Sequence, residues 1–169
     1  MKRITLLFVF IGMITLQSCT VNEVTDEYDN DTISQVFEYS NVNLTNSNGY
    51  SSVLTYPFAL YTSDMVLVYR LQGSGSTDVW KLLPETYYFD DGTLNFGYRN
   101  DFTRFDAEVN LYGFDLPGLN SEYRLNQVFR VVVIPANLNG KSEVVDFNDY
   151  NAVSKKYQLD KANVIKVQE

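Results

Sequence analysis

Two acidic side chains near the middle of the chain have a spacing that permits acid–base catalysis. Asp106 and Glu108 lie two positions apart in an alternating segment, so on an extended strand both point to the same face. A glycosidase needs two carboxyl groups roughly 5–10 Å apart, and this spacing allows that separation. The alternation itself favours a simpler interpretation, in which both acids are solvated on the water-facing side of a strand.

Residues that the sequence lacks exclude several kinds of catalytic and metal site. It contains no histidine and a single cysteine, which removes Ser-His-Asp and Cys-His nucleophiles and the commonest zinc and copper ligand sets. The glycine-rich phosphate loops of dinucleotide-binding and P-loop proteins are also missing. Asp29 and Asp31 suggest the start of a calcium loop, but its glycine and its closing glutamate are absent. We therefore expect no catalytic, cofactor or metal site, and predict a non-enzymatic protein.

Aromatic side chains are abundant, with 13 tyrosines and 11 phenylalanines. An exposed row of tyrosines would stack on sugars or form a protein interface, because tyrosine combines an apolar ring with a polar tip. The simpler interpretation, which we favour, is that they rim the core with their hydroxyls reaching water. The tyrosines on or beside the expected strands are Tyr50, Tyr56, Tyr61, Tyr69, Tyr87, Tyr88, Tyr98, Tyr112 and Tyr123.

Three other side chains stand out against their surroundings. The single tryptophan, Trp80, precedes an aromatic run, and we expect it in the core rather than in a ligand platform. Arg70 and Arg130 each interrupt a strongly apolar segment. They form either a buried ionic or binding pair, or they bury their stems and reach solvent at an edge, as long basic side chains commonly do. The second alternative is the one we favour.

The first part of the chain has the layout of an export signal. Lys2 and Arg3 precede an apolar stretch, Ile4–Leu16, that is too short to span a bilayer comfortably. Leu16-Gln17-Ser18-Cys19 then resembles the bacterial lipobox, which has an aliphatic residue three positions before a cysteine and a small residue directly before it. The resemblance implies a signal peptide over 1–18 and lipid modification of Cys19. The alternative is an ordinary signal peptide whose last residues happen to include a cysteine.

The segment that follows Cys19 is acidic. Residues 20–34 carry five acids and no base and show no hydrophobic period, which predicts a flexible tether between a lipid and a domain. The whole chain has a net charge of −8, and losing Lys2 and Arg3 makes it more negative. Such a chain repels nucleic acid and gains no polybasic attraction to a membrane. Membrane attachment must therefore come from acyl chains on Cys19, and several of them hold far better than one.

From residue 35 onward the sequence predicts short strands. Asp64–Leu71 and Gln127–Ile134 are apolar on both faces and are expected to be central strands covered on both sides. Asp91-Gly92 predicts a type I′ hairpin turn. Phe102–Tyr112 alternates, which predicts that Thr103, Phe105, Ala107, Val109 and Leu111 point inward. The other expected strands are Val36–Thr45, Tyr50–Tyr56, Val79–Leu83, Thr86–Phe89 and Val164–Val167.

A change of period near the C-terminus predicts one short helix. Phe147, Tyr150, Val153 and Tyr157 recur at helical spacing, so a helix is expected at about 148–158, capped by Asp146 or Asn148. Strands otherwise dominate and no βαβ alternation occurs. The predicted fold of residues 35–169 is mainly β: an antiparallel β-sandwich with a short C-terminal helix.

Four segments of this domain also carry a family resemblance: VFEYSNVNLT (36–45), DMVLVYRL (64–71), DVWKLLPETYYFDDGTLNFGY (78–98) and NQVFRVVVIPA (126–136). They resemble an uncharacterised family of small Bacteroidota lipoproteins over most of 35–169. In those relatives a collagen-like segment often precedes the domain, where this chain has its acidic tether. Some are labelled dihydrolipoamide dehydrogenase, but this chain lacks the paired cysteines and flavin-binding glycines of that enzyme. The resemblance implies localisation and fold and transfers no active site.

Together these features predict a lipoprotein of the cell envelope, held to the outer membrane by acyl chains on Cys19. The expected role is a non-enzymatic interaction or structural module with a protein or glycan partner and without nucleic acid. The alternative is a carbohydrate-binding surface lipoprotein that uses exposed tyrosines.

Overall fold

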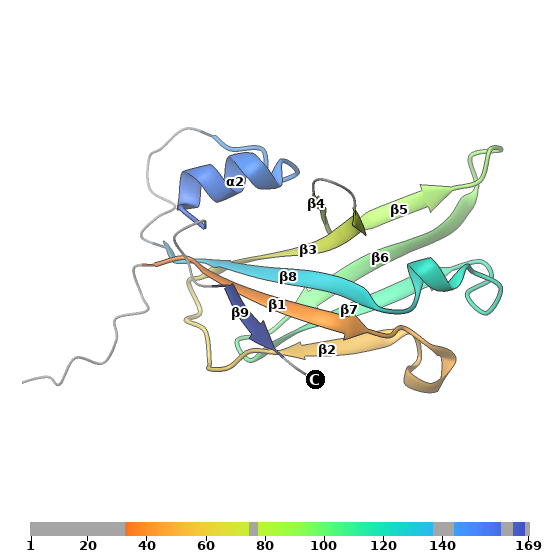
Figure 1. The fold of residues 1–169 in the computed structure, drawn as a ribbon, viewed down its shortest axis with the longest axis horizontal. Helices are drawn as coiled ribbons and strands as arrows, with labels where there is room; N and C mark the ends of the chain where they lie inside the picture. Colours follow the sequence, from red (N-terminus) through yellow and green to blue (C-terminus); the bar gives the residue numbers. More distant parts are fainter. Residues whose placement is uncertain (1–32, 75–77, 137–143, 160–163, 168–169) are drawn as a thin grey trace, which may run out of the picture.

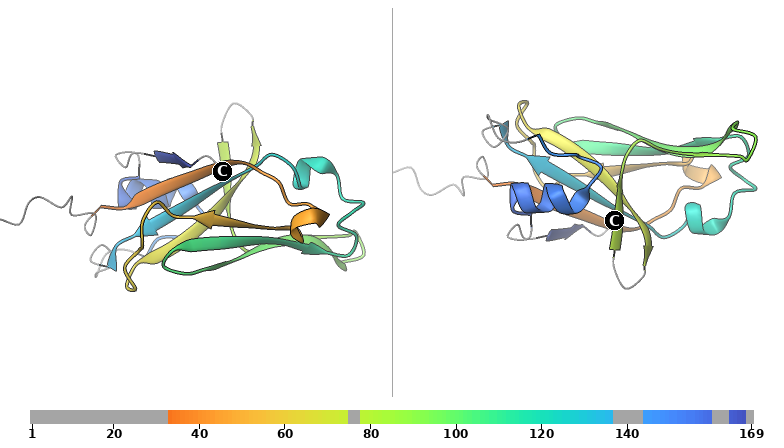
Figure 2. Two further views of the ribbon diagram at one scale, coloured as in Figure 1. Left: turned by 90° about the horizontal axis from the view of Figure 1, so that it is seen from below. Right: turned by 90° about the horizontal axis from the view of Figure 1, so that it is seen from above.

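The computed structural model describes residues 33–74, 78–136, 144–159 and 164–167, which form two β-sheets packed face to face (Figures 1 and 2). One sheet has the strand order β4-β3-β8-β1-β9 and the other the order β2-β7-β6-β5. The first consists of β1 (Gln35–Val42), β3 (Met65–Ser74), β4 (Asp78–Leu82), β8 (Gln127–Ile134) and β9 (Val164–Val167). The second consists of β2 (Ser51–Thr55), β5 (Glu85–Tyr88), β6 (Leu94–Phe102) and β7 (Asp106–Gly113). The predicted fold class, a mainly β sandwich, is confirmed.

Among the residues that the structure describes, the strand pairs are antiparallel with one exception. β9 runs parallel to β1, with Val36 opposite Val164 and Tyr39 opposite Val167. β3 and β8 pair antiparallel from Met65 and Ile134 onward and lie in the middle of the five-stranded sheet. Both had been predicted to be central, and β8 has the predicted bounds.

Two hydrophobic clusters lie on opposite faces of the five-stranded sheet, which explains why its central strands are apolar on both sides. Val68 of β3 belongs to the cluster between the sheets, whereas the adjacent Tyr69 belongs to the cluster on the outer face. The helix α2 (Tyr150–Tyr157) covers that outer face with its buried residues Val153 and Tyr157 (Figure 1). The largest buried side chains between the sheets include Phe37, Tyr39, Leu44, Leu54, Tyr98 and Phe129.

The helix begins later than predicted. Its N-cap is Asp149, whose carboxylate accepts hydrogen bonds from the backbone N–H groups of Asn151 and Ala152. The prediction of Asp146 or Asn148 as the cap was wrong, because the Asp146 carboxylate accepts from the Asn148 N–H in the turn before the helix. Hydrogen bonding of Asp146 to Asn148 also holds the pKa of this carboxyl below its usual value.

Two hairpin turns also differ from the prediction. Between β5 and β6, Gly92 has a positive φ of 82° but Asp91 does not, so the turn is not type I′, which requires both. The Gly92 N–H donates to the Phe89 carbonyl and the Phe89 N–H to the Thr93 carbonyl, which makes a three-residue loop ending in a left-handed glycine. Asp91 keeps its ordinary conformation because its carboxylate accepts from the Thr93 N–H.

The second difference concerns the segment that was predicted to be one strand from Phe102 to Tyr112. It contains the turn between β6 and β7, closed by the pair Phe102–Ala107 and by the bond from the Thr103 N–H to the Asp106 carbonyl. Ala107, Val109 and Leu111 point inward as predicted. The prediction was wrong for Thr103 and Phe105, which lie in the turn and are exposed, Phe105 by 59%. The alternation continues across the turn, so the pattern alone did not reveal the reversal.

The two ends of the sandwich carry different loops and turns. The near end is the one at which β1 begins, where the loop 56–64 and the turn 103–105 also lie (Figure 1). The far end carries the hairpin between β5 and β6 and two short 3₁₀ helices, η1 (Asn46–Asn48) and η2 (Ser121–Tyr123) (Figure 1).

Candidate functional site

A polar group between the two sheets is built around Arg70. Its side chain is 3% exposed and crosses from β3 to the opposite sheet. There its Nε lies 3.0 Å from Oε2 of Glu85 on β5, and its guanidinium carbon lies 4.4 Å from the centre of the Tyr98 ring on β6. The sequence-based preference for an arginine that reaches solvent is therefore wrong for Arg70, and the buried ion pair is the correct alternative.

The remaining partners of this guanidinium are also protein atoms. Nη1 donates to the Gln127 side-chain oxygen at 3.1 Å, and Nη2 donates to the Tyr87 hydroxyl at 2.9 Å. The Tyr87 hydroxyl in turn donates to Glu85. Burial and the hydrogen bond to Glu85 raise the pKa of Tyr87 to about 12, against the opposing effect of Arg70. The network therefore keeps Tyr87 protonated to a higher pH than an ordinary tyrosine and joins the two sheets.

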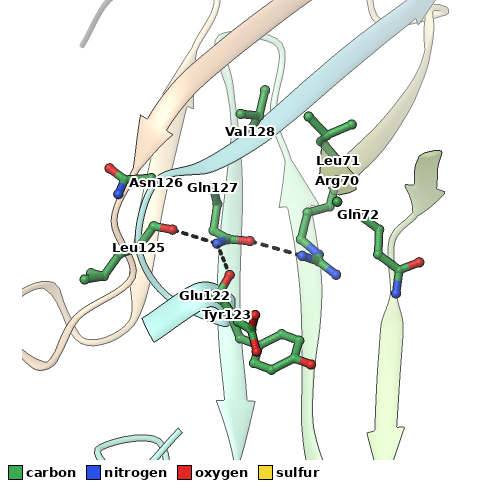
Figure 3. A pocket seen from close by; sticks show the side chains of 10 residues that line it. Arg70, Leu71, Gln72, Glu122, Tyr123, Leu125, Asn126, Gln127 and Val128 are labelled. Carbon is green, nitrogen blue, oxygen red and sulfur yellow. Dashed lines mark hydrogen bonds between the residues drawn. The ribbon is translucent and has the colours of Figure 1, made fainter. Parts of the chain in front are cut away.

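An open cavity of about 470 Å³ lies beside this network at the far end (Figure 3). Arg70 and Gln127 form one side of it, and the Gln127 amide nitrogen is held by the backbone carbonyls of Glu122 and Leu125 (Figure 3). Tyr123 offers an aromatic side chain to the cavity. The other side chains that line it and carry polar groups are Gln72, Glu122 and Asn126. Sequence reasoning missed this cavity, because its lining comes from two segments, 70–73 and 122–128, that are far apart in the chain.

Arg130 forms a second ion pair on the outer face of the five-stranded sheet. Its Nη2 lies 2.8 Å from Oε2 of Glu38, and its Nη1 donates to the Tyr150 hydroxyl of α2 at 3.0 Å. The guanidinium carbon lies 4.0 Å from the Trp80 ring centre. Trp80 is 7% exposed, which confirms the prediction that it belongs to the core. Arg130 thus occupies the aromatic surface that a ligand cation would need.

The predicted tyrosines do not form an exposed row. Tyr61 and Tyr88 are exposed, but they lie at opposite ends of the sandwich. Tyr69 and Tyr98 are fully buried and donate to the backbone carbonyls of Phe147 and Tyr123, so their hydroxyls tie loops to the sheets instead of reaching water. The other tyrosines named from the sequence are buried (Tyr50, Tyr56) or half-buried (Tyr87, Tyr112, Tyr123).

The carboxylate pair considered for catalysis lies on β7, where both groups have local partners. Asp106 accepts a hydrogen bond from the Thr103 hydroxyl, and Glu108 accepts one from the Ser51 hydroxyl on β2. Glu108 is exposed and Asp106 is half-buried. These contacts agree with the solvated strand face that the alternation favoured.

Exposed apolar side chains gather at the far end around the β5–β6 hairpin. This far-tip patch consists of Tyr88, Phe89, Leu94 and Phe114. Phe114 is 82% exposed, and its ring meets that of Phe89 edge to face with 6.3 Å between centres. Tyr88 and Leu94 are paired across the hairpin. These side chains therefore keep much of their apolar surface in water.

The residues of the export signal, Cys19 and most of the predicted tether, including Asp29 and Asp31, lie outside the described residues. Within the described ranges, no group of three or more acidic, histidine or cysteine side chains is arranged to hold a metal ion. Over those same ranges, no helix has the length and apolar character needed to cross a membrane.

No protein-family model matches this chain, and no curated protein and no solved structure is significantly similar to it.

Proposed function

We propose that this chain is a lipoprotein of the bacterial cell envelope, anchored through Cys19, whose far-tip patch binds a protein partner. The observation that carries the proposal is the difference between the two ends of the sandwich. The chain enters β1 at the near end, and the hairpin between β5 and β6 lies at the far end (Figure 1). The exposed patch is carried by this hairpin and by Phe114, which directly follows β7. A domain tethered at one end presents the other end outward, which is the geometry of a membrane-held interaction module.

Support for the anchor comes from the arrangement of the first nineteen residues. The basic start, the apolar stretch and Leu16-Gln17-Ser18-Cys19 occur in the order that lipidation of Cys19 requires. Two or more acyl chains give attachment that persists, whereas one chain alone binds a bilayer weakly and reversibly. Bacteria attach lipid to exported proteins that carry a lipobox. We therefore assign the domain to the outer membrane, on either of its faces.

The chemistry of the partner follows from the charges around the far-tip patch. Asp90, Asp91 and Asp115 lie within or beside the two segments that carry the patch, 86–96 and 112–118, and these segments contain no lysine or arginine. Exposed aromatic side chains supply the contact area typical of interface centres. The surrounding acids favour a partner that places lysine or arginine around an apolar centre.

A non-enzymatic role is supported by the way the buried polar groups are used. The charged side chains between the sheets, Arg70 and Glu85, bond to each other and to neighbouring side chains. A catalytic group must be free to contact substrate, whereas the hydrogen bonds of Arg70 and Glu85 join the two sheets.

The anchor is tested by metabolic labelling with a radioactive or clickable fatty acid in the native host. We expect the wild type and Ser18→Ala to incorporate label, because alanine preserves the small residue before the cysteine. Cys19→Ser should incorporate none. Equal labelling of Cys19→Ser and the wild type would overturn the anchor.

The partner is tested by placing a photo-reactive phenylalanine analogue at position 114 and, as a matched control, at position 105 of the near end. Both Phe114 and Phe105 are exposed, so both positions tolerate the change. Irradiation of intact cells should link position 114 to a protein whose cross-linked peptide contains lysine or arginine beside apolar residues. Cross-linking of position 114 to glycan, or to no macromolecule at all, would contradict this proposal.

A carbohydrate ligand is the second candidate, and the cavity beside Arg70 is the observation that favours it. Its volume of about 470 Å³ exceeds that of a monosaccharide, and Gln72, Asn126 and Tyr123 offer amide groups and an aromatic ring. Glycan-array binding that is lost in Asn126→Leu and retained in Phe114→Ser would select this function over the protein partner.

A further inference from the structure

A second group of exposed aromatic side chains lies at the near end. This near-end patch consists of Phe58, Tyr61, Phe102 and Phe105, on the loop 56–64 and at the turn between β6 and β7. Phe102 and Phe105 are 53% and 59% exposed. Phe105 was predicted to point inward, and the proposed function assigns no role to this patch.

The two segments that carry the patch are fixed to each other. The Tyr56 and Leu60 N–H groups donate to the carbonyls of Phe105 and Arg104, each at 2.8 Å. The Arg104 Nε donates back to the Leu60 carbonyl at 2.6 Å. A hollow of about 200 Å³ lies between the segments, lined by Leu60, Tyr61, Phe102 and Arg104. These aromatic side chains are therefore displayed on a braced surface and not on an independent loop.

From this arrangement we infer that the near end rests in the interfacial layer of a lipid bilayer, with Phe102 and Phe105 inserted among the headgroups. Phenylalanine rings on the apolar face of an interfacial segment bury at the boundary between headgroups and acyl chains, and Tyr61 adds the polar tip that is typical of aromatic side chains in this layer. Exposed Arg104, with its guanidinium carbon 5.9 Å from the Phe105 ring centre, is placed to contact lipid phosphate while its stem stays beside the rings.

The position of the chain start supports the bilayer as the occupant, and this step rests on the proposed anchoring through Cys19. Ile33, the first described residue, is exposed and precedes β1 at the near end. The residues from Cys19 to Ile33 span at most about 50 Å when fully extended, and about 20 Å on average if they behave as a flexible coil. The ten residues of β3 alone extend about 33 Å. The anchor therefore holds the near end closer to the membrane than the far end.

The charges at the near end define how the contact is made. Asp64, Asp101 and Asp106 accompany Arg104 there, and Asp106 is bonded to the Thr103 hydroxyl. This surplus of acid gives no attraction to anionic lipid. Insertion of the rings must drive the contact, so it should not depend on anionic lipid or on low salt.

The test uses the sole cysteine as a chemical tether. The chain 19–169 contains every residue that the structure describes, and its Cys19 thiol can be coupled to a maleimide lipid without any cellular acylation. Phe105→Trp and Phe114→Trp place a reporter at the near and far ends, and the emission of buried Trp80 is subtracted with the wild type. The vesicles consist of phosphatidylcholine with brominated acyl chains, which quench tryptophan on contact.

We expect bromolipid to quench the emission added by Phe105→Trp at least threefold more than that added by Phe114→Trp, at low and high salt alike. Equal quenching of the two variants, or stronger quenching of Phe114→Trp, would overturn the inference. Quenching that requires added phosphatidylglycerol would overturn the apolar mode of contact. Because the tether is made chemically, these outcomes are independent of fatty-acid labelling at Cys19, which tests the anchor itself.

Discussion

Arg70 and Arg130 lie on the adjacent strands β3 and β8 and point to opposite faces of the five-stranded sheet. Phe129 pairs with Arg70 and Tyr69 pairs with Arg130, so the two arginines differ by one position in register. That single step sends Arg70 between the sheets to Glu85 and sends Arg130 under α2 to Glu38 and Trp80. Each face of the sheet therefore has its own ion pair.

The buried ion pair should matter strongly for stability when one partner is removed. Arg70→Met leaves the Glu85 carboxylate, with its side chain 13% exposed, without its cation, and we expect a loss of about 3–5 kcal/mol in the free energy of unfolding. Urea unfolding followed by circular dichroism measures it. The exposed Arg99 is the matched control, because Arg99→Met should change stability by less than about 0.5 kcal/mol.

A double variant separates the charge from the packing at this position. If the loss comes from an uncompensated carboxylate, Arg70→Met combined with Glu85→Leu should recover at least about 1 kcal/mol relative to Arg70→Met alone. A double variant as unstable as the sum of the two single variants would show that the ion pair does not account for the loss.

Two buried tyrosines should respond in opposite ways to the loss of a hydroxyl. The Tyr98 hydroxyl donates to the Tyr123 carbonyl, whereas the buried Tyr56 hydroxyl has no hydrogen-bond partner among the described residues. Tyr98→Phe should therefore cost about 1–2 kcal/mol, and Tyr56→Phe should be neutral or stabilising. Thermal and urea unfolding of the two variants in parallel provide the measurement, and an equal cost for both would contradict the assigned bonding.

The buried tyrosines also predict how stability depends on alkaline pH. Burial raises the pKa of Tyr56, Tyr69 and Tyr98 well above the ordinary value of 10.0. Above pH 10 the unfolded chain therefore binds fewer protons than the folded protein. The resulting stabilisation is complete below pH 10 and is lost as the pH rises toward the folded-state values, at up to about 1.4 kcal/mol per pH unit for each tyrosine.

Absorbance at 295 nm, which reports tyrosinate, checks this alkaline transition. The signal of Tyr56, Tyr69 and Tyr98 should appear together with unfolding, and Tyr98→Phe should make the decline in stability less steep. Ionisation of Tyr56, Tyr69 and Tyr98 near pH 10 in a protein that remains folded would be inconsistent with their burial.

Two glycines should be required for different physical reasons. Gly92 has a φ of 82° and open space around an added Cβ, so Gly92→Ala should cost about 1 kcal/mol through backbone strain, and Gly92→Asn less. An added Cβ at Gly97 would lie 2.6 Å from the Glu85 carbonyl oxygen and the Tyr112 hydroxyl, so Gly97→Ala should cost about 2–3 kcal/mol. Unfolding measurements that reverse this order would show that the turn or the strand contact is misplaced.

The fold class followed from local pattern, because a strand with one or two buried faces shows it in its own residues. Gln127–Ile134 is apolar at nearly every position, and it forms the strand predicted for it, buried on both faces. The short helix was found from the spacing of Val153 and Tyr157. Its cap was misplaced because Asp146, Asn148 and Asp149 are all suitable types, and only the backbone conformation distinguishes them.

The polar sites were harder to predict from the sequence, because they depend on which strands face each other. The isolated Arg70 in an apolar segment was a visible signal, but its partners lie on β5, β6 and β8 and are not adjacent to it in sequence. Phe105 was placed in the core because alternation runs unbroken through the turn that contains it. Long-range pairing, not residue type, decided these outcomes.

The parallel pairing of β9 with β1 has a consequence for how the domain assembles. Val36 and Val164 meet although nearly all of the domain lies between them in the sequence, so their contact carries a large loop-closure cost and should form late. Until then the outer hydrogen-bonding edge of β1 is uncovered, and an open edge is a template for pairing with another chain. Self-association during refolding should therefore be greatest before β9 pairs with β1. Truncation of the chain before Val164, which removes β9, should make this self-association permanent.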